Sequence, residues 1–445
     1  MRRLIFLLML CTANFLSAQP GEINPLNLQF SGQLHPLFRY QTSDYTQLDL
    51  PFRIASGEVE GRLGELEIRG RGVLETRWSE IQFMEPVLRE LYLHWHPEFG
   101  EVKIGKVIHH WGLADGWNPT DNLSPYNFYY LFESGAERKL GELSLNMTIN
   151  FGHWDLETVV VNAHRPNVLP WDEEDFPLVP TFDPRNQLIS RGDELQYGIR
   201  LNGNLQGIDF STSYFRGFDH MPGIIGADIL PGEPIPVFTR PEFKHGYRKT
   251  DVYGLDAAGM LGDLAIRAEG AFFRTKNDYR PGLFDVKRSL TGNYIEYILQ
   301  LEYIFSNDLA VTGQIMGREH FTVTGVALDD ITQIADAAGE YEEADLSGDF
   351  LPGMGIPYLY FARQLAGLSA RKTYLESRLD LRGFGLVGVE EPGAYLGIQS
   401  YYRAFRSVEI QLGYLHVFKG EQPDNVFSRL KDFSHFSFRM IFPIQ

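Results

Sequence analysis

A strict alternation of apolar and polar residues is the feature that most constrains the fold of this chain. Every odd position from 143 to 151 is large and apolar, and every even position between them is polar. The same period of two recurs, less strictly, at 195–202, 295–305 and 436–442. Successive side chains of a β-strand point to opposite faces of a sheet. These segments are therefore predicted to be strands with one apolar and one polar face.

Two architectures accommodate such strands. A soluble sandwich or β-helix buries the apolar face in protein, whereas a membrane barrel turns that face to lipid and lines its lumen with the polar one. Strands of about 10 to 15 residues are long enough for a tilted membrane crossing. Short turns alternate with long loops, and aromatic residues gather near strand ends, as at 126–130 and 401–402. We therefore predict an all-β, transmembrane, antiparallel, up-and-down β-barrel.

The spacing of the connections gives the number of strands. Eight short turns are predicted near positions 63–64, 97–100, 151–154, 203–207, 261–263, 306–308, 366–370 and 405–407. Nine longer connections are predicted at 42–50, 79–85, 109–137, 163–190, 219–248, 276–290, 322–354, 390–393 and 420–430. Together they join about 18 strands, and both chain ends fall on the short-turn side, which is the periplasmic side of such barrels. If the ambiguous segment 356–364 belongs to a loop, we expect 16 strands instead.

The N-terminus has the pattern of an export signal. Arg2 and Arg3 precede a short apolar run, and Ser17 and Ala18 provide small residues before a cleavage point. We predict a secretory signal peptide at 1–18 and an outer-membrane barrel at 19–445. The only cysteine, Cys11, lies inside the signal, so the mature chain forms no disulfide. The net charge of −18 becomes −20 when the two arginines are removed, which argues against a nucleic-acid partner.

A loop rich in turn residues follows the fifth predicted strand. Glycine, proline, asparagine and aspartate are dense between 112 and 125, and two tryptophans lie among them. This is the third external loop, which in general porins folds into the lumen and narrows it. We expect such a constriction loop to present Trp111, Asp115, Trp117 and Asp121, with the two carboxylates adding negative charge. The alternative is a rigid external loop that packs on the rim.

Two predicted strands carry charges at alternate positions. Because charges against lipid are costly, these side chains are expected to line the lumen. They either form a polarised pore wall that orients a solute or form cross-strand ion pairs that stiffen the wall. The first ladder comprises Glu67, Arg69, Arg71, Glu75 and Arg77, and the second comprises Glu376, Arg378, Asp380 and Arg382.

No metal, cofactor or catalytic site is expected. His94 and His96 share a strand face, but the hairpin register puts them ~20 Å from His109 and His110, so these four histidines cannot form one site. Two acidic stretches, at 172–175 and 329–349, lack a calcium-binding spacing and are expected to be solvated loops. No nucleophile motif is present, so we expect no enzyme. The pair Asp219-His220 leaves an outer-membrane hydrolase as a third interpretation.

The stretch from Gly105 to Pro125, with Trp111-Gly112, Ala114-Asp115-Gly116 and a following NPTDNLSP run, resembles a motif of porin-like outer-membrane barrels of Gram-negative bacteria. Some of these poorly characterised barrels are similar to alginate-export barrels, and some are suspected to act beside lipid exporters. The resemblance implies a location in the outer membrane and supplies no catalytic residue. The chain departs from the usual pattern at its end, where Phe442 is followed by three further residues.

Two functions from different classes follow. The first is a passive channel for small polar solutes. The second is a barrel component of a lipid or polysaccharide export system without free pore activity. The expected partners are outer-membrane lipid and lipopolysaccharide, a small polar solute, and either further copies of the chain or a periplasmic protein. The sequence does not name the solute, because selectivity depends on where a few side chains lie in the lumen.

Overall fold

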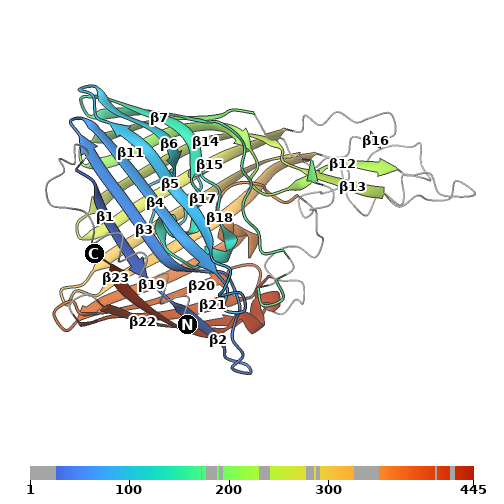
Figure 1. Ribbon diagram of the computed structural model, residues 1–445. Helices are drawn as coiled ribbons and strands as arrows, with labels where there is room; N and C mark the ends of the chain where they lie inside the picture. The colour runs from blue at the N-terminus through green and yellow to red at the C-terminus, as the bar shows by residue number, and fades with distance from the viewer. Residues whose placement is uncertain are drawn as a thin grey trace, which may run out of the picture.

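A computed structural model describes residues 27–171, 173–176, 188–189, 194–229, 241–276, 285–286, 291–324, 350–405, 408–420 and 426–444 of the 445-residue chain. These residues form a tilted antiparallel β-barrel with loops extending from one end (Figure 1). The predicted signal peptide and the acidic stretch at 329–349 lie outside the described residues.

The barrel wall consists of consecutive strands, each paired with its neighbours in the sequence. The first half contains β1 (Gln29–Leu34), β2 (Leu37–Gln41), β3 (Phe52–Leu63), β4 (Leu66–Thr76), β5 (Glu85–Trp95), β6 (Gly100–Val107), β7 (Glu142–Phe151), β8 (Trp154–Val161), β10 (Gln196–Leu205) and β11 (Ile208–Phe218). The second half contains β14 (Lys249–Leu261), β15 (Leu264–Lys276), β17 (Thr291–Ile304), β18 (Ala310–Thr324), β19 (Gln364–Tyr374), β20 (Leu379–Gly388), β21 (Ala394–Phe405), β22 (Val408–Phe418) and β23 (His435–Ile444).

The first and last strands close the barrel. β1 pairs with β3 on one side and with β23 on the other, and β2 continues the pairing with β23. Pro36, which has no N–H to donate, separates β1 from β2, so the two segments are one interrupted strand. The described chain therefore forms 18 strands, and the prediction of a closed antiparallel barrel of that size is confirmed.

The two faces of the wall have the expected chemistry. Leu143 and Leu145 of β7 are exposed on the outside, whereas Ser144 and Asn146 between them are buried on the inside. In β17 likewise the polar residue Glu296 is buried on the inside and the apolar residue Leu299 is exposed on the outside. Apolar side chains that cover the outside of a barrel are suited to lipid, and a polar interior is typical of outer-membrane barrels.

The first and last residues of the described chain both lie at the end of the barrel that carries the short turns. Gln29 at the start of β1 lies opposite Glu60 of β3, three residues before the β3–β4 turn begins at Leu63. Ile444 lies opposite Gly32 of β1, close to the same rim. The predicted orientation of the chain ends relative to the turns is therefore present in the fold.

One predicted turn was wrong. The expected turn at 366–370 lies inside β19, and the chain turns instead at 375–378, where Tyr374 pairs with Leu379. Three consecutive residues there have positive φ angles, namely Leu375 at 53°, Glu376 at 56° and Ser377 at 66°. None of them is a glycine or asparagine, the residues that normally mark such a backbone, so the turn left no signal in the sequence.

The ambiguous segment 356–363 belongs to a loop, which contains the 3-10 helix η6 (Pro357–Tyr360). The expectation of 16 strands in that case was also wrong, because the displaced turn restores the lost strand. The second predicted charge ladder is broken for the same reason. Glu376 and Arg378 lie in the turn, and Asp380 and Arg382 lie on β20.

The long connections carry further structure. A small sheet of β9 (Leu188–Ile189), β12 (Gly223–Ile229), β13 (Pro241–Gly246) and β16 (Asp285–Val286) projects beyond the wall (Figure 1). Short helices occur at η1 (Phe128–Tyr130), η2 (Gly135–Arg138), α2 (Val426–Arg429) and η7 (Leu430–Phe433). Among the described residues, no helix is long and apolar enough to cross a bilayer.

Candidate constriction site

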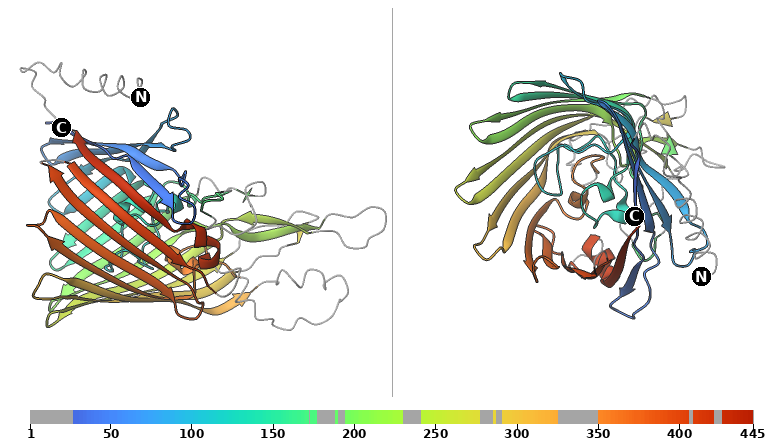
Figure 2. Two further views of the ribbon diagram at one scale, coloured as in Figure 1. Left: turned by 90° about the horizontal axis from the view of Figure 1, so that it is seen from below. Right: turned by 60° about the vertical axis from the view of Figure 1, so that its left-hand side comes forward.

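The connection between β6 and β7 folds into the barrel. Residues 108–141, teal in Figure 2, coil inside the ring of strands in the right-hand view. Two parts of this inner loop contact different parts of the wall: its tip at 111–121 and its return segment at 133–139. The sequence prediction of a loop that enters the lumen, made against the alternative of a loop on the rim, agrees with this placement.

Glu269 of β15 holds the tip of the inner loop. Its carboxylate accepts hydrogen bonds from the backbone N–H groups of Leu113 at 2.6 Å and Ala114 at 2.5 Å. It also accepts one from the hydroxyl of Thr120 at 3.0 Å. Glu269 is buried. Three donors from one loop on one carboxylate fix both the position and the backbone direction of the tip.

Asp115 extends this attachment to β17 and β18. Its backbone N–H donates to Oε1 of Gln300 at 2.8 Å, and the Gln300 amide donates back to the Asp115 carboxylate at 2.7 Å. Gln314 donates to the backbone carbonyl of Asp115 at 3.1 Å. Arg267 lies 3.3 Å from the same carboxylate, whose side chain is 64% exposed. Asp115 is therefore an attached but accessible charge in the lumen.

Trp111 anchors the inner loop to the neighbouring part of the wall. The indole N–H donates to Glu157 of β8 at 3.0 Å, and the ring is buried. Gly198 of β10 lies directly beneath the ring, where an added Cβ would approach Trp111 to 2.5 Å. The absence of a side chain at this strand position makes the close contact feasible.

Asp121 has a different role from the one expected. It is buried, and its carboxylate lies 2.5 Å from the ammonium of Lys139 in the return segment of the loop. Lys139 also donates to the backbone carbonyl of His109 at 2.9 Å. Burial lowers the pKa of Lys139, and the charge of Asp121 opposes that effect. The pair braces the inner loop, so the lumen charge expected from two aspartates rests on Asp115 alone.

Trp117 joins the inner loop to a second inward segment. Its ring lies 4.0 Å from the ring of Tyr358, which belongs to the 350–363 part of the β18–β19 connection. The guanidinium carbon of Arg138 lies over the same Trp117 ring, 3.8 Å from its centroid. Asn122 accepts a hydrogen bond from the backbone of Gly355 at 3.1 Å. The two segments therefore hold each other inside the barrel.

The second segment has its own attachment to the wall. Glu296 of β17 accepts a hydrogen bond from the backbone N–H of Ile356 at 2.6 Å. Arg318 of β18 pairs with Glu296 at 2.7 Å and donates to the carbonyl of Leu359 at 3.1 Å. A buried ion pair with additional hydrogen bonds to a loop restricts the conformations that the loop can adopt.

The return segment of the inner loop is tied to the opposite side of the lumen by ion pairs. Glu137 pairs with Arg53 of β3 and Arg71 of β4, and Arg89 of β5 lies 3.8 Å from it. Glu133 pairs with Arg439 of β23. Burial disfavours the Glu133 carboxylate, but the nearby arginines outweigh it and hold its pKa at about 2. The inner loop thus spans the lumen from β15–β18 to β3–β5 and β23.

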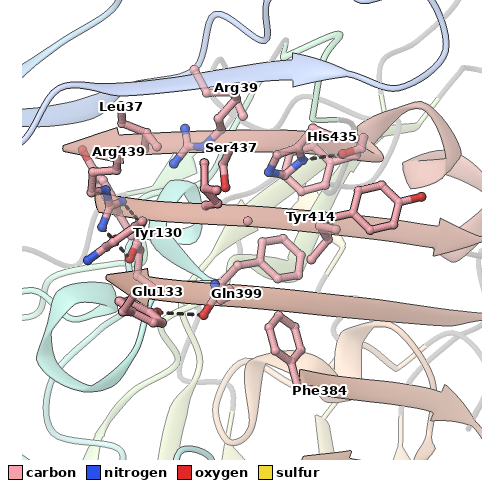
Figure 3. A pocket seen from close by; sticks show the side chains of 18 of the residues that line it. Leu37, Arg39, Tyr130, Glu133, Phe384, Gln399, Tyr414, His435, Ser437 and Arg439 are labelled. Carbon is pink, nitrogen blue, oxygen red and sulfur yellow. Dashed lines mark hydrogen bonds and ion pairs between the residues drawn. The ribbon is translucent and has the colours of Figure 1, made fainter. Parts of the chain in front are cut away.

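A pocket lies between this return segment and the wall formed by β2 and β20–β23. Figure 3 shows Arg39, Glu133, Gln399 and Arg439 directed into it from separate elements, with dashed lines joining Glu133 to Arg439. Its other side is aromatic and includes Phe384 and Phe433. The pocket thus combines ionic and amide groups with apolar surface, which is the mixture that small polar organic molecules require.

The first charge ladder faces the lumen but does not stand free in it. Arg53 of β3 donates to Glu75 at 3.0 Å, Arg69 donates to Glu67 at 3.1 Å, and Arg71 pairs with Glu58 at 3.2 Å. Arg77, just beyond β4, pairs with Glu173 of the β8–β10 connection at 2.9 Å. On β20, Asp380 pairs with Arg382 at 2.8 Å and with Arg371 at 2.9 Å. These contacts favour the cross-strand ion-pair interpretation over an unpaired charged wall.

An apolar cluster adjoins the pocket. It combines the inner-loop residues Trp117 and Phe128 with Leu359 of the second segment, inward-facing Tyr395 of β21, and Phe433, which also lines the pocket. Side chains packed in this way exclude water from this part of the interior.

Several residues of this site were not predicted from the sequence. Glu269, Gln300 and Glu296 were visible only as polar positions within alternating strands. Arg138 and Lys139 were visible only as charges at the end of the loop. A carboxylate or amide at an inward position of a long strand is the signal that would have identified candidate loop anchors, although it does not indicate which loop each one holds.

The pair Asp219-His220 is structural. Asp219 accepts hydrogen bonds from Arg248 at 2.7 Å and Thr250 at 2.5 Å. The two ring nitrogens of His220 contact the backbone carbonyls of Arg165 at 3.1 Å and Asn122 at 2.9 Å. Both His220 nitrogens face backbone carbonyls, and the nearest partners of Asp219 are a guanidinium and a threonine hydroxyl. This arrangement gives no support to the hydrolase interpretation.

Solved outer-membrane barrels share this fold. Acinetobacter baumannii OccAB3 aligns with 95% of this chain and 100% of its own, at 9% identity and a TM-score of 0.51. Pseudomonas aeruginosa OccK5 (OpdH) aligns over 94% and 99%, at 10% identity and a TM-score of 0.52. Pseudomonas aeruginosa OccK11 (OpdR) aligns over 96% and 99%, at 10% identity and a TM-score of 0.50. No protein-family model and no curated protein matches the sequence.

The chain is therefore a closed 18-stranded β-barrel of the type found in the outer membrane of Gram-negative bacteria. The expectation of a porin-like outer-membrane barrel agrees with these structural neighbours at the level of the fold. The resemblance of the 105–125 stretch and the similarity to alginate-export barrels stay expectations.

Proposed function

We propose that this chain forms an outer-membrane porin-like channel through which small polar solutes pass by diffusion. The observation that carries the proposal is the inner loop, which crosses the lumen from Glu269 on β15 to Arg53 on β3. A loop held at both ends inside a wide barrel narrows the passage without relying on a separate plug domain. The barrels with the same fold align over nearly their whole length.

The route that we propose runs beside the inner loop and past the pocket between the return segment and β20–β23. Arg39, Gln399 and Arg439 offer hydrogen-bond donors there, and Phe384 and Phe433 offer apolar surface. Asp115 provides the accessible negative charge at the loop tip. Polar groups near an aromatic surface can replace part of the hydration shell of a small solute during passage.

We further propose that the outward apolar face contacts outer-membrane lipid and lipopolysaccharide, as the exposed leucines of β7 and β17 require. Association with further copies of the chain or with a periplasmic protein is part of the same proposal. Cross-linking in native membranes, followed by mass measurement, distinguishes these two partners.

The test is the conductance of the purified mature protein in a planar bilayer. We expect stable ohmic steps from the wild type. A Glu269→Ala and Gln300→Ala double variant releases the loop tip and should give larger or noisier steps. Asn150→Ala, at the exposed short-turn end of β7 and away from both the loop tip and the pocket, is the matched control and should conduct as the wild type does.

The absence of conductance from a folded, inserted barrel would overturn the channel proposal. A barrel that is silent as the wild type and conducts only as the double variant would mean that the inner loop closes the lumen rather than narrowing it. Either result would direct attention to the export of a lipid or polysaccharide.

A further inference from the structure

Three potential metal ligands meet on the lumen face near the short-turn end of β4 and β5. Glu67 of β4 lies directly opposite His94 of β5 in the strand register. His96 follows two residues later, on the same side of the chain as His94. Leu93 and Trp95, which alternate with the histidines, are exposed on the outside of the barrel. The distance that separates these two histidines from His109 and His110 therefore does not exclude a metal site, because Glu67 offers a third ligand through the pairing of β4 with β5.

One nitrogen of each histidine lies close to the Glu67 carboxylate and has no hydrogen-bond partner in the part of the chain that the structure describes. Nδ1 of His94 lies 3.9 Å from Oε2 of Glu67, and Nε2 of His96 lies 3.6 Å from the same oxygen. One ligand atom from each of the three residues lies within 4.8 Å of the others. Among the described residues, these two buried histidine nitrogens have no hydrogen-bond partner. Unsatisfied buried nitrogens aimed at one carboxylate oxygen are unusual in a folded protein.

We propose that Glu67, His94 and His96 bind a divalent transition-metal ion, with Zn²⁺ as the reference ion. Imidazole nitrogens and a carboxylate oxygen are the donors that Zn²⁺ accepts, at about 2.0–2.2 Å from the ion. Tetrahedral geometry at that radius places donor atoms about 3.3–3.5 Å apart. The separations of 3.6 and 3.9 Å need to shorten by only a few tenths of an ångström.

The surroundings of His94 are those of a metal ligand. Its other ring nitrogen, Nε2, contacts the carboxylate of Glu101 on β6 at 3.1 Å. A proton on Nε2 that is donated to Glu101 leaves the lone pair of Nδ1 directed at Glu67. Carboxylates in this position commonly orient histidine ligands and increase their basicity. Lys103 pairs with Glu101 at 3.3 Å and holds it in place.

The three side chains lie on the lumen face, and the contact that Glu67 already makes with Arg69 can be rearranged when an ion binds. The His96 side chain is 35% exposed although its Nε2 atom is buried, so a small movement of the ring is needed for an ion to reach the three donor atoms. Arg69 donates to the same oxygen of Glu67 at 3.1 Å, and it must share that oxygen or turn away when the ion binds. Its side chain is 45% exposed, which leaves room for that movement.

Equilibrium dialysis of the mature protein in detergent, prepared without a polyhistidine tag, tests the site with Zn²⁺. We expect one ion per chain. Glu67→Gln, His94→Ala and His96→Ala should each weaken binding by at least about tenfold, and Glu101→Gln should weaken it by about 10- to 100-fold. His153→Ala removes an exposed histidine from another short turn and is the matched control, which should bind as the wild type does.

The shift in electrophoretic mobility between unheated and boiled samples shows whether each variant still forms the barrel. Weak binding that is equal in the wild type, Glu67→Gln and His153→Ala would overturn the proposal, because it would reflect scattered surface ligands. Co²⁺ provides a second readout, since a bound ion in a nitrogen and oxygen site gives visible absorption bands that Glu67→Gln should remove. These tests measure binding alone, so they stand or fall independently of channel conductance.

Discussion

Asp115 and Gln300 form a reciprocal pair across the lumen, although they lie 185 positions apart in the chain. The backbone N–H of Asp115 donates to the Gln300 carbonyl oxygen, and the Gln300 amide donates to the Asp115 carboxylate. Gln314 donates to both partners, at 3.1 Å to the Asp115 carbonyl and at 2.9 Å to Gln300. The tip of the inner loop is thereby fixed to two adjacent strands while its carboxylate still faces the lumen.

The charge of Asp115 should influence ion selectivity. Asp115→Asn removes an accessible negative charge and should lower the cation-to-anion permeability ratio measured from reversal potentials. The matched variant Asp263→Asn removes an exposed charge from the short turn between β14 and β15, away from the inner loop, and should leave the ratio unchanged. Equal effects of the two substitutions would show that Asp115 has no special place on the solute path.

The buried pair of Asp121 and Lys139 should be important for stability. Asp121→Asn leaves the Lys139 ammonium buried without its partner, and we expect a loss of about 3–5 kcal/mol in the free energy of unfolding. Urea unfolding in detergent, followed by tryptophan fluorescence, measures this loss. Asp432→Asn breaks an exposed pair with Lys431 and should cost less than about 1 kcal/mol. Similar losses for both variants would contradict the bracing role.

Gly198 should tolerate no side chain, because Trp111 occupies the space above it. Gly198→Ala forces the indole away from Glu157 and should destabilise the protein by about 1–3 kcal/mol, with increased current noise as the loop loosens. Gly313→Ala, on β18, has open space around the new methyl group and is the matched control. A stable and electrically quiet Gly198→Ala channel would argue against Trp111 as a loop anchor.

A buried histidine of the inner loop should make the fold sensitive to acid. Burial lowers the pKa of His109 to about 3, from 6.5 in an unfolded chain. Between about pH 3 and pH 6.5 the unfolded state binds more protons than the folded state. The free energy of unfolding therefore decreases as the pH falls below about 6.5. His109→Gln should flatten the dependence of the urea midpoint on pH between 6.5 and 4. His153→Gln, at an exposed turn, should leave that dependence as it is in the wild type.

Much of the barrel was predictable because strand periodicity is a local property. The alternation at 143–151 identified which side chains of β7 face outward, and the spacing of turn residues gave the number of strands. The turn at Leu375–Ser377 was not predicted, because its backbone is left-handed without a glycine. The turn that was predicted, at 366–370, lies inside a continuous strand. Tertiary pairing overrode the local signal there.

The candidate site was predictable only in part. The dense turn residues between 112 and 125 indicated a loop of fixed shape, and its position after the fifth strand suggested entry into the lumen. The separate roles of Asp115 and Asp121 were not predictable, because one contacts Gln300 on the far wall and the other contacts Lys139 within the loop. The contact of Glu67 with His94 and His96 was not predictable for the same reason, because these residues meet only when β4 pairs with β5.

The sequence by itself therefore determined the barrel, its two chemically different faces, its approximate strand number and the loop that enters it. These depend on periodicity and turn chemistry, which act over a few residues. Only the tertiary structure decided which groups meet across the lumen, because closing the barrel sets strands far apart in the chain opposite the same loop. Glu269 and Gln300 hold the tip of the inner loop for that reason, and no pattern near either residue records the contact.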